Sequence, residues 1–283
     1  MMNGFKLYGK EHLLWLLITL LCIAALFFVN NRTGIGSSAD GVPHSGRADA
    51  KTPLHLLRAL AVCSLLFHLL ESGFRICEGS YGIDTLPLHI CSISSYLVFI
   101  HMLLSWRSAR EVSASPAGIA GEASASSGST GRHAPLTPQT IIGEILFCPG
   151  IAGSLCALLA PDWTAYPAFS FISTVSFLSH IAIILYVIRA VRVRLITPAA
   201  GRAYIPVLYL AAYALVMIPL DRHFHVNYGF LNYPSPGSVL EPLSDIFGSG
   251  AGYYLGYSLL VLAGIAASYL LYRSAAAKAH KNA

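Results

Sequence analysis

Long, almost uncharged apolar blocks dominate this sequence and restrict the environment in which it can fold. The first block reads LLWLLITLLCIAALFFV without interruption, and six more follow along the 283 residues. A bilayer offers no water to backbone polar groups, so an apolar run of about 20 residues predicts a membrane-spanning helix. Charged residues make up only 11% of the chain, whereas soluble domains contain about 25%. We therefore expect an integral membrane protein and not a soluble enzyme domain.

The blocks predict an all-α, polytopic membrane helix bundle with about seven transmembrane helices, which forms a single transmembrane domain over residues 1–283. The sixth block is the weakest because it is short and flanked by Pro206 and Pro219, although membrane helices tolerate proline. The first block is too long for a signal-peptide core, so we expect it to be retained. The predicted spans are 11–29, 54–74, 86–106, 140–160, 169–189, 203–220 and 251–272.

Lysine and arginine are divided unevenly between the two sides of the predicted bundle. Fourteen lie on the side that holds the C-terminus, and four lie on the other side: Lys6, Lys10, Arg75 and Arg222. Because cytoplasmic loops of membrane proteins are enriched in these residues, the C-terminus is predicted inside and the N-terminus outside. The net charge of +5 is modest, and we expect no nucleic-acid partner.

The segment between the third and fourth spans, residues 107–139, has a different composition. It is rich in serine, alanine and glycine and has few apolar residues. Such a segment cannot bury enough apolar surface to fold, so we expect a disordered cytoplasmic linker.

The cysteine pattern argues against a disulfide framework and against a metal site. Five of the six cysteines lie inside apolar segments, and no CxxC or Cys/His metal-binding spacing is present. The sequence also lacks a GxGxxG, a Walker loop and a CxxCH motif. We therefore predict neither a metal nor a cofactor.

Polar side chains inside the second span share one helix face. His68, Glu71 and Arg75 are spaced i, i+3 and i+7, so they line up near the outer end. Glu71 and Arg75 can pair directly. One interpretation is a structural ion pair at the interface, and the other is that His68 and Glu71 form the wall of a polar pocket.

The third span begins with a cluster of reactive and polar residues. Cys91 lies near the electropositive N-terminus of this span, which favours a thiolate; alternatively, it is a small residue that packs between helices. His89 and Cys91 are two residues apart and face different directions, whereas Cys91 and Ser95 share a face, and Ser92 can touch His89.

His180 lies in the middle of the fifth span, where a histidine is expected to face the bundle interior. It would lie about 16 Å deep along its helix, whereas Cys91 would lie only about 7 Å past Leu86. A direct contact between the two therefore requires tilted helices or a re-entrant start of the third span.

Four segments together resemble one family, the YwaF-like integral membrane proteins of bacteria. The resemblance covers residues from about 54 to 272, with the motifs in the same order and at the same spacing. The segments are LPLHICSISSYL (86–97), EILFCPGIAGSLCALLAPDW (144–163), YPAFSFISTVSFLSHI (166–181) and NYGFLNYPSPGSVLEPLSDIFG (227–248).

This family is similar to a eukaryotic transmembrane acyltransferase that moves acyl chains between phospholipids by means of a membrane cysteine and a histidine. The resemblance implies a bacterial cytoplasmic membrane, a phospholipid or lysophospholipid substrate, and catalytic roles for Cys91 and His180. It also marks recurrent positions at His89, Glu144, Asp162, Asn227 and Tyr228. Of these, we predict structural roles for Glu144 and Asp162 and pocket positions for Asn227 and Tyr228.

Two functions follow from these residues. In the first, Cys91 attacks a lipid acyl ester, His180 or His89 acts as base, and Ser92 or Asn227 helps to hold the oxyanion. In the second, the protein is a transporter or small-molecule binder in which His68, Glu71, His180 and Glu144 line a path. A scaffold without small-molecule chemistry is a third possibility. The sequence does not indicate the oligomeric state.

Overall fold

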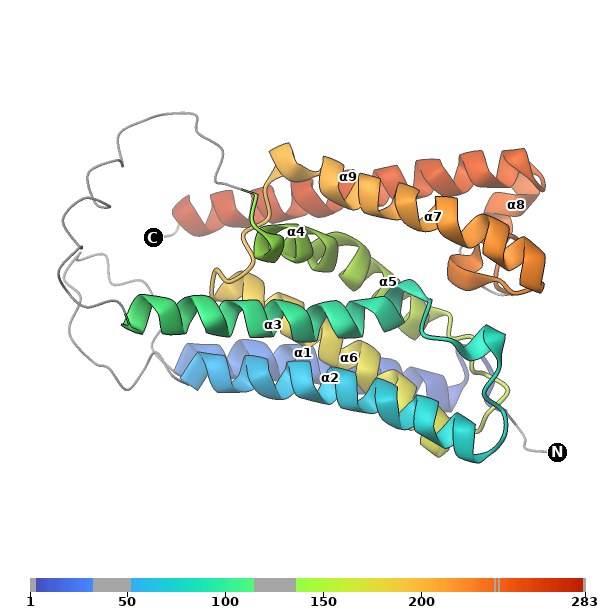
Figure 1. Cartoon of the computed structure of the whole chain (residues 1–283), viewed down its shortest axis with the longest axis horizontal. Coiled ribbons are helices and arrows are strands. Elements are labelled where there is room, and N and C mark those ends of the chain that lie inside the picture. Colours follow the sequence, from blue (N-terminus) through green and yellow to red (C-terminus); the bar gives the residue numbers. More distant parts are fainter. Residues whose placement is uncertain (1–3, 33–51, 115–135, 237, 239, 282–283) are drawn as a thin grey trace.

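The computed structural model describes residues 4–32, 52–114, 136–236, 238 and 240–281, and these residues are folded into helices and connecting turns without a strand. Figure 1 shows them as a bundle of long helices that run nearly side by side. The helices are α1 (Lys10–Arg32), α2 (Thr52–Cys77), α3 (Ile90–Ala114), α4 (Pro138–Ile145), α5 (Ile151–Leu159), α6 (Phe171–Arg192), α7 (Tyr204–Phe224), α8 (Glu241–Phe247) and α9 (Ala251–Lys281).

The predicted membrane bundle is confirmed. Among the described residues, seven helical segments are long and apolar enough to cross a bilayer, and each overlaps one predicted span. The fourth segment is not one continuous α-helix, because the π-helical turn Leu146–Gly150 joins α4 to α5. Pro149 lies inside this turn, where its missing N–H removes a helical hydrogen bond.

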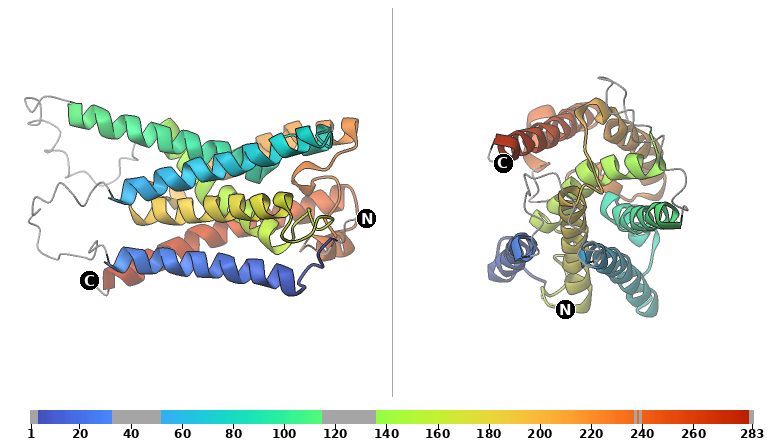
Figure 2. Two further views of the ribbon diagram at one scale, coloured as in Figure 1. Left: turned by 90° about the horizontal axis from the view of Figure 1, so that it is seen from below. Right: turned by 90° about the vertical axis from the view of Figure 1, so that its left-hand side faces the viewer.

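Helix α6 is the central helix of the bundle. In the end-on view of Figure 2 it runs between α1 on one side and α2 and α3 on the other. In its most apolar stretch 72% of the residues are buried, against 17–50% for the other six spans. Its apolar side chains pack against α2, α3 and the π-turn on one side and against α1 and α5 on the other. Because lipid is as apolar as these side chains, close packing holds the helices together here.

The two ends of the bundle differ in chemistry. At one end α1 and α9 begin, and the connecting segments 78–89, 160–170 and 225–250 lie there. We call this end the cavity end, after the cavity described below. We call the other the arginine end, which carries Arg189, Arg192, Arg194 and Arg202. With seven spans, the beginning of α1 and the end of α9 lie at opposite ends (Figure 1).

Helix α3 starts four residues later than the predicted span and at a greater depth. Residues 86–89 form a turn, and the helix begins at Ile90. Figure 1 shows this start recessed behind the ends of α2 and α7. The predicted span therefore included four residues that belong to the preceding turn.

The predicted linker at 107–139 is only partly described. Helix α3 continues to Ala114 and α4 begins at Pro138, with Thr137 as its N-cap. The helical residues 107–114 shorten the predicted linker, and residues 115–135 lie outside the described part of the chain.

Candidate functional site

A large cavity of about 910 Å³ opens at the cavity end and extends deep between the helices. Its two walls have different chemistry. Helices α2, α3 and α6 contribute mostly polar side chains, whereas α5, α7 and α9 contribute mostly small and apolar ones. The polar wall includes His68, Glu71, Arg75, His89, Cys91, Ser92, Ser95, Ser176, Ser179 and His180, and the apolar wall includes Val207, Leu210, Ala214, Ile218, Val261 and Ile265. An amphipathic cavity of this kind suits a ligand with a polar and an apolar part.

Glu71 is the centre of a hydrogen-bonded chain on the polar wall. Its carboxylate accepts from Arg75 at 3.0 Å, as the spacing of the second span predicts, and from the hydroxyl of Ser176 on α6 at 3.0 Å. Arg75 in turn donates to the Tyr166 hydroxyl at 3.4 Å and stands over its ring. The charge of Glu71 is therefore compensated inside the cavity, as burial of a carboxylate requires.

His180 has one occupied and one free ring nitrogen. Its Nδ1 lies 2.6 Å from the backbone oxygen of Ser176, one helical turn earlier. A carbonyl oxygen only accepts, so Nδ1 carries the proton and the lone pair of the neutral ring is on Nε2. Nε2 is buried and has no partner among the described residues, and the Trp163 ring stacks on the imidazole at 5.3 Å. This histidine is thus held in the tautomer that a general base needs.

Cys91 lies in the first turn of α3 and lines the same cavity as His180. Glu71 and Asp162 line this cavity as well. Helix α5 approaches this turn closely: a Cβ added at Gly153 would lie 3.4 Å from the Ile90 side chain. Helix α5 therefore packs against the turn that carries the thiol.

A set of tyrosine hydroxyls ties together the two turns that border the cavity. Tyr213 donates to the Leu88 oxygen at 2.9 Å, and Tyr228 donates to the Ile83 oxygen. Tyr253 and Tyr257 donate to oxygens of residues 230 and 229 at 2.7 and 3.0 Å. Burial raises the pKa of Tyr228 to about 12, so its phenol stays protonated and remains a donor. The Tyr228 bond joins the two turns directly, and the other three bonds attach the turns to α7 and α9.

His89 packs against this tyrosine-linked region. Its ring meets the Tyr228 ring edge-on, with centroids 4.9 Å apart. The backbone N–H of Tyr228 donates to the fully buried Asp221 at 3.0 Å, and the second carboxylate oxygen of Asp221 has no described partner. His89 lines the cavity, so it lies near Cys91 without sharing its helix face.

Three of the predicted residues lie outside the large cavity. Asn227 uses its side chain within its own loop, since its amide donates to the Tyr233 oxygen and its oxygen accepts from the Asn232 N–H. Tyr228 contacts His89 from behind the cavity lining. Glu144 lies at the arginine end, in the first helix of the fourth span. Asp162, for which we predicted a structural role, is exposed and lines the cavity.

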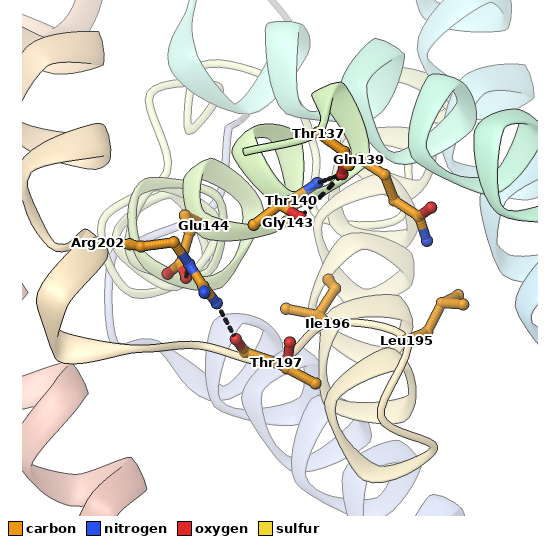
Figure 3. A pocket seen from close by; sticks show the side chains of 9 residues that line it. All are labelled: Thr137, Gln139, Thr140, Gly143, Glu144, Leu195, Ile196, Thr197 and Arg202. Atoms are coloured by element: carbon orange, nitrogen blue, oxygen red, sulfur yellow. Dashed lines mark hydrogen bonds and ion pairs between the residues drawn. The ribbon is translucent and has the colours of Figure 1, made fainter. Parts of the chain in front are cut away.

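Glu144 belongs to a second, smaller cavity of about 210 Å³, shown in Figure 3. The Glu144 carboxylate is 1% exposed and accepts from Arg202 at 2.7 Å, from the Ala199 N–H at 3.1 Å and from the Tyr269 hydroxyl at 2.5 Å. These partners come from α9 and from the residues just before α7. Glu144 therefore ties α4 to two further spans and leaves no carboxylate oxygen unpaired.

Sequence reasoning missed several residues of the site. Ser176 precedes His180 by one helical turn, and this spacing was the available signal for its contact. Trp163 follows Asp162 in a loop and gave no indication that it would stack on a histidine. The apolar wall of α7 and α9 could not be recognised, because every membrane helix is apolar.

Within the described ranges, no group of histidine, cysteine, aspartate and glutamate is arranged to hold a metal ion. All six cysteines are free.

Comparison with protein families gives a clear result. The model of the TMEM164 family matches residues 7–271. The chain belongs to the TMEM164 family. The match covers nearly the whole chain and agrees with seven apolar helices in an integral membrane protein. A comparison with curated proteins finds no match, and neither does a comparison with solved structures. The YwaF-like resemblance of this TMEM164-family chain stays a prediction.

Proposed function

We propose that this protein is an intramembrane lipid acyltransferase, or an acyl hydrolase, that uses Cys91 as nucleophile and His180 as base. One observation carries the proposal: Cys91 and His180 line one amphipathic cavity, and Nε2 of His180 has no partner among the described residues. A lipid fits this cavity with its headgroup and ester near the polar wall and its acyl chain along α7 and α9. The lipid is a phospholipid, and the acceptor is a lysophospholipid or water.

In the first half of the reaction, Nε2 of His180 takes the proton from the Cys91 thiol and the sulfur attacks the ester carbonyl carbon. The bond between this carbon and the glycerol oxygen then breaks, and His180 gives the proton to the leaving oxygen. The products are a thioester on Cys91 and a lysolipid.

In the second half, the acceptor hydroxyl gives its proton to His180 and its oxygen attacks the thioester carbon. The carbon–sulfur bond breaks and the sulfur recovers the proton. A lysolipid acceptor gives acyl exchange, and water gives hydrolysis, so the same residues support both outcomes. His89, at the rim of the cavity, is the second candidate base.

The transporter interpretation has less support. It required Glu144 to share a path with His68, Glu71 and His180, but Glu144 lies in the smaller cavity and is bound by Arg202 and Tyr269. Uptake by proteoliposomes that contain the purified protein would favour a transporter over an enzyme.

We further propose that the cavity end faces away from the cytoplasm of a bacterial cell. The four arginines of the arginine end support this orientation, since positive residues mark the cytoplasmic side. The cavity would then receive its lipids from the outer leaflet of the cytoplasmic membrane.

The decisive experiment measures acyl exchange by the purified protein in nanodiscs. A phospholipid with a labelled acyl chain is mixed with a lysophospholipid, and products are followed by mass spectrometry. We expect Cys91→Ala to abolish exchange and to remove a hydroxylamine-sensitive acyl adduct from the intact protein. Cys63→Ala, on α2 and outside the cavity lining, is the matched control and should retain both. Unchanged exchange by Cys91→Ala would refute the nucleophile assignment.

A further inference from the structure

Acyl transfer to a thiol needs hydrogen-bond donors for the carbonyl oxygen, which becomes negative in the tetrahedral intermediate. The side-chain amide of Asn227 is used within its own loop. The Ser92 hydroxyl lines the cavity, but a single hydroxyl is a weak substitute for two converging donors. The donors must therefore be sought in the backbone near Cys91.

The start of α3 supplies unpaired backbone donors. The first N–H groups of any helix have no partner inside it, and in α3 the first turn-closing bond runs from Ile93 to the His89 oxygen. Within the described part of the chain, no oxygen accepts from the N–H groups of Ile90, Cys91 or Ser92. The two donors nearest the thiol along the chain are the N–H groups of Cys91 itself and of Ser92, and both residues line the cavity. These free donors are therefore close to the atom at which the intermediate would form.

A second, independent feature of the same cavity indicates a ligand at this position. His180 is 7% exposed, and its Nε2 is buried without a partner, although the residue lines the cavity. A buried nitrogen without a hydrogen bond raises the free energy of the folded protein unless a ligand or water supplies the missing partner. His180, Cys91 and Ser92 line the same cavity, and a free base and free amide donors complement each other chemically.

We propose that the backbone N–H groups of Cys91 and Ser92, in the first turn of α3, form the oxyanion hole of this cavity. This inference rests on the proposed function and names the groups that stabilise its intermediate. The partial positive charge of the helix N-terminus adds to the two donors. Their orientation is fixed before substrate arrives, because Tyr213 holds the Leu88 oxygen and Gly153 allows α5 to pack on Ile90.

Replacing Ser92 by proline tests the role of its backbone N–H directly. Ser92→Pro removes one N–H from the first helical turn, where proline is tolerated, and Ser92→Ala removes only the hydroxyl. We expect the acyl-exchange rate of Ser92→Pro to fall roughly 10²–10³-fold below that of Ser92→Ala, the usual loss for one oxyanion donor. Affinity for an unreactive ether analogue of the lipid should be the same in both variants. Affinity for a lipid trifluoromethyl ketone, which forms a tetrahedral adduct with the thiol, should be lower in Ser92→Pro.

The outcomes separate this inference from the proposed function. If Cys91→Ala is inactive but Ser92→Pro equals Ser92→Ala in rate and in ketone affinity, the oxyanion assignment is wrong and the proposed function stands. If Cys91→Ala stays active, both are wrong. Should Ser92→Pro fail to fold, replacement of Ser92 by its α-hydroxy acid exchanges the same N–H for an ester oxygen, and the same comparison with Ser92→Ala decides.

Discussion

At the scale of single residues, the chemistry of the site depends on how neighbouring groups use up hydrogen-bonding capacity. His180 is available as a base because the Ser176 carbonyl binds one of its nitrogens and no described group binds the other. Asn227 is unavailable because its own loop uses both ends of its amide. The identity of a polar residue therefore indicates its possible role, and its partners decide whether it can perform that role.

We expect His180→Asn to lower the acyl-exchange rate about 10²–10⁴-fold, the usual contribution of general acid–base catalysis. Lipid binding should persist, because asparagine keeps a polar group on the same wall. The control is His225→Asn: His225 is exposed and left-handed, with φ 55°, a conformation that asparagine adopts well. Equal rates for the two variants would exclude His180 as the base.

At the scale of helices, the start of α3 is the element on which the site depends. The start of this helix is recessed relative to the ends of α2 and α7 (Figure 1). Cys91 in its first turn and His180 in the middle of α6 line the same cavity. Helix α5 packs on this turn, where Gly153 faces Ile90.

Gly153→Leu should displace this turn. Overpacking in a tight contact costs about 1–3 kcal/mol, so we expect a lower midpoint of thermal unfolding in detergent together with reduced acyl exchange. Gly73→Ala is the control, because an added Cβ at Gly73 meets nothing within 4 Å and alanine favours a helix. Wild-type stability and exchange in Gly153→Leu would show that the approach of α5 to α3 is unimportant.

At the scale of the whole molecule, two layers of helices enclose the cavity, with a polar wall on α2, α3 and α6 and an apolar wall on α7 and α9. The layers are joined at the arginine end by Glu144, Arg202 and Tyr269 and at the cavity end by tyrosine hydroxyls.

Ala214→Trp should fill part of the apolar wall and shorten the space for an acyl chain. We expect exchange of long acyl chains to fall about tenfold or more relative to short ones, in line with the discrimination that a few methylenes give. Ala212→Trp, on the exposed part of the same helix and outside the cavity lining, should leave the chain-length preference unchanged. An unchanged preference in Ala214→Trp would remove the apolar wall from the acyl-chain site.

The orientation of the bundle can be tested through Cys77, an exposed thiol at the cavity end of α2. A membrane-impermeant maleimide should label Cys77 in intact cells if this end faces outward. In a Cys77→Ser background, a cysteine introduced at Thr197, an exposed residue of the arginine end, should be labelled only after permeabilisation. The reverse pattern would invert the proposed orientation.

Much of the architecture could be predicted from sequence because lipid imposes a simple rule. Apolar blocks near 20 residues must become helices in a bilayer, and the seven predicted spans overlap the seven observed ones. Helix-face arguments also succeeded locally, since Glu71 and Arg75 form the predicted pair. The predicted start of the third span was less accurate. Leu86 and Leu88 are apolar enough to continue a span, but they belong to the turn before α3.

The sequence by itself determined that the chain is a membrane helix bundle and which scarce polar residues it carries, because the cost of burying polar groups in lipid acts on each segment separately. The tertiary structure decided which of these residues meet: Cys91 and His180 share a cavity, whereas Glu144 is held elsewhere by Arg202. Which polar residues meet depends on the depth of each helix, on the turn before α3 and on the packing between helices. These are contacts between distant segments, and no single segment encodes them.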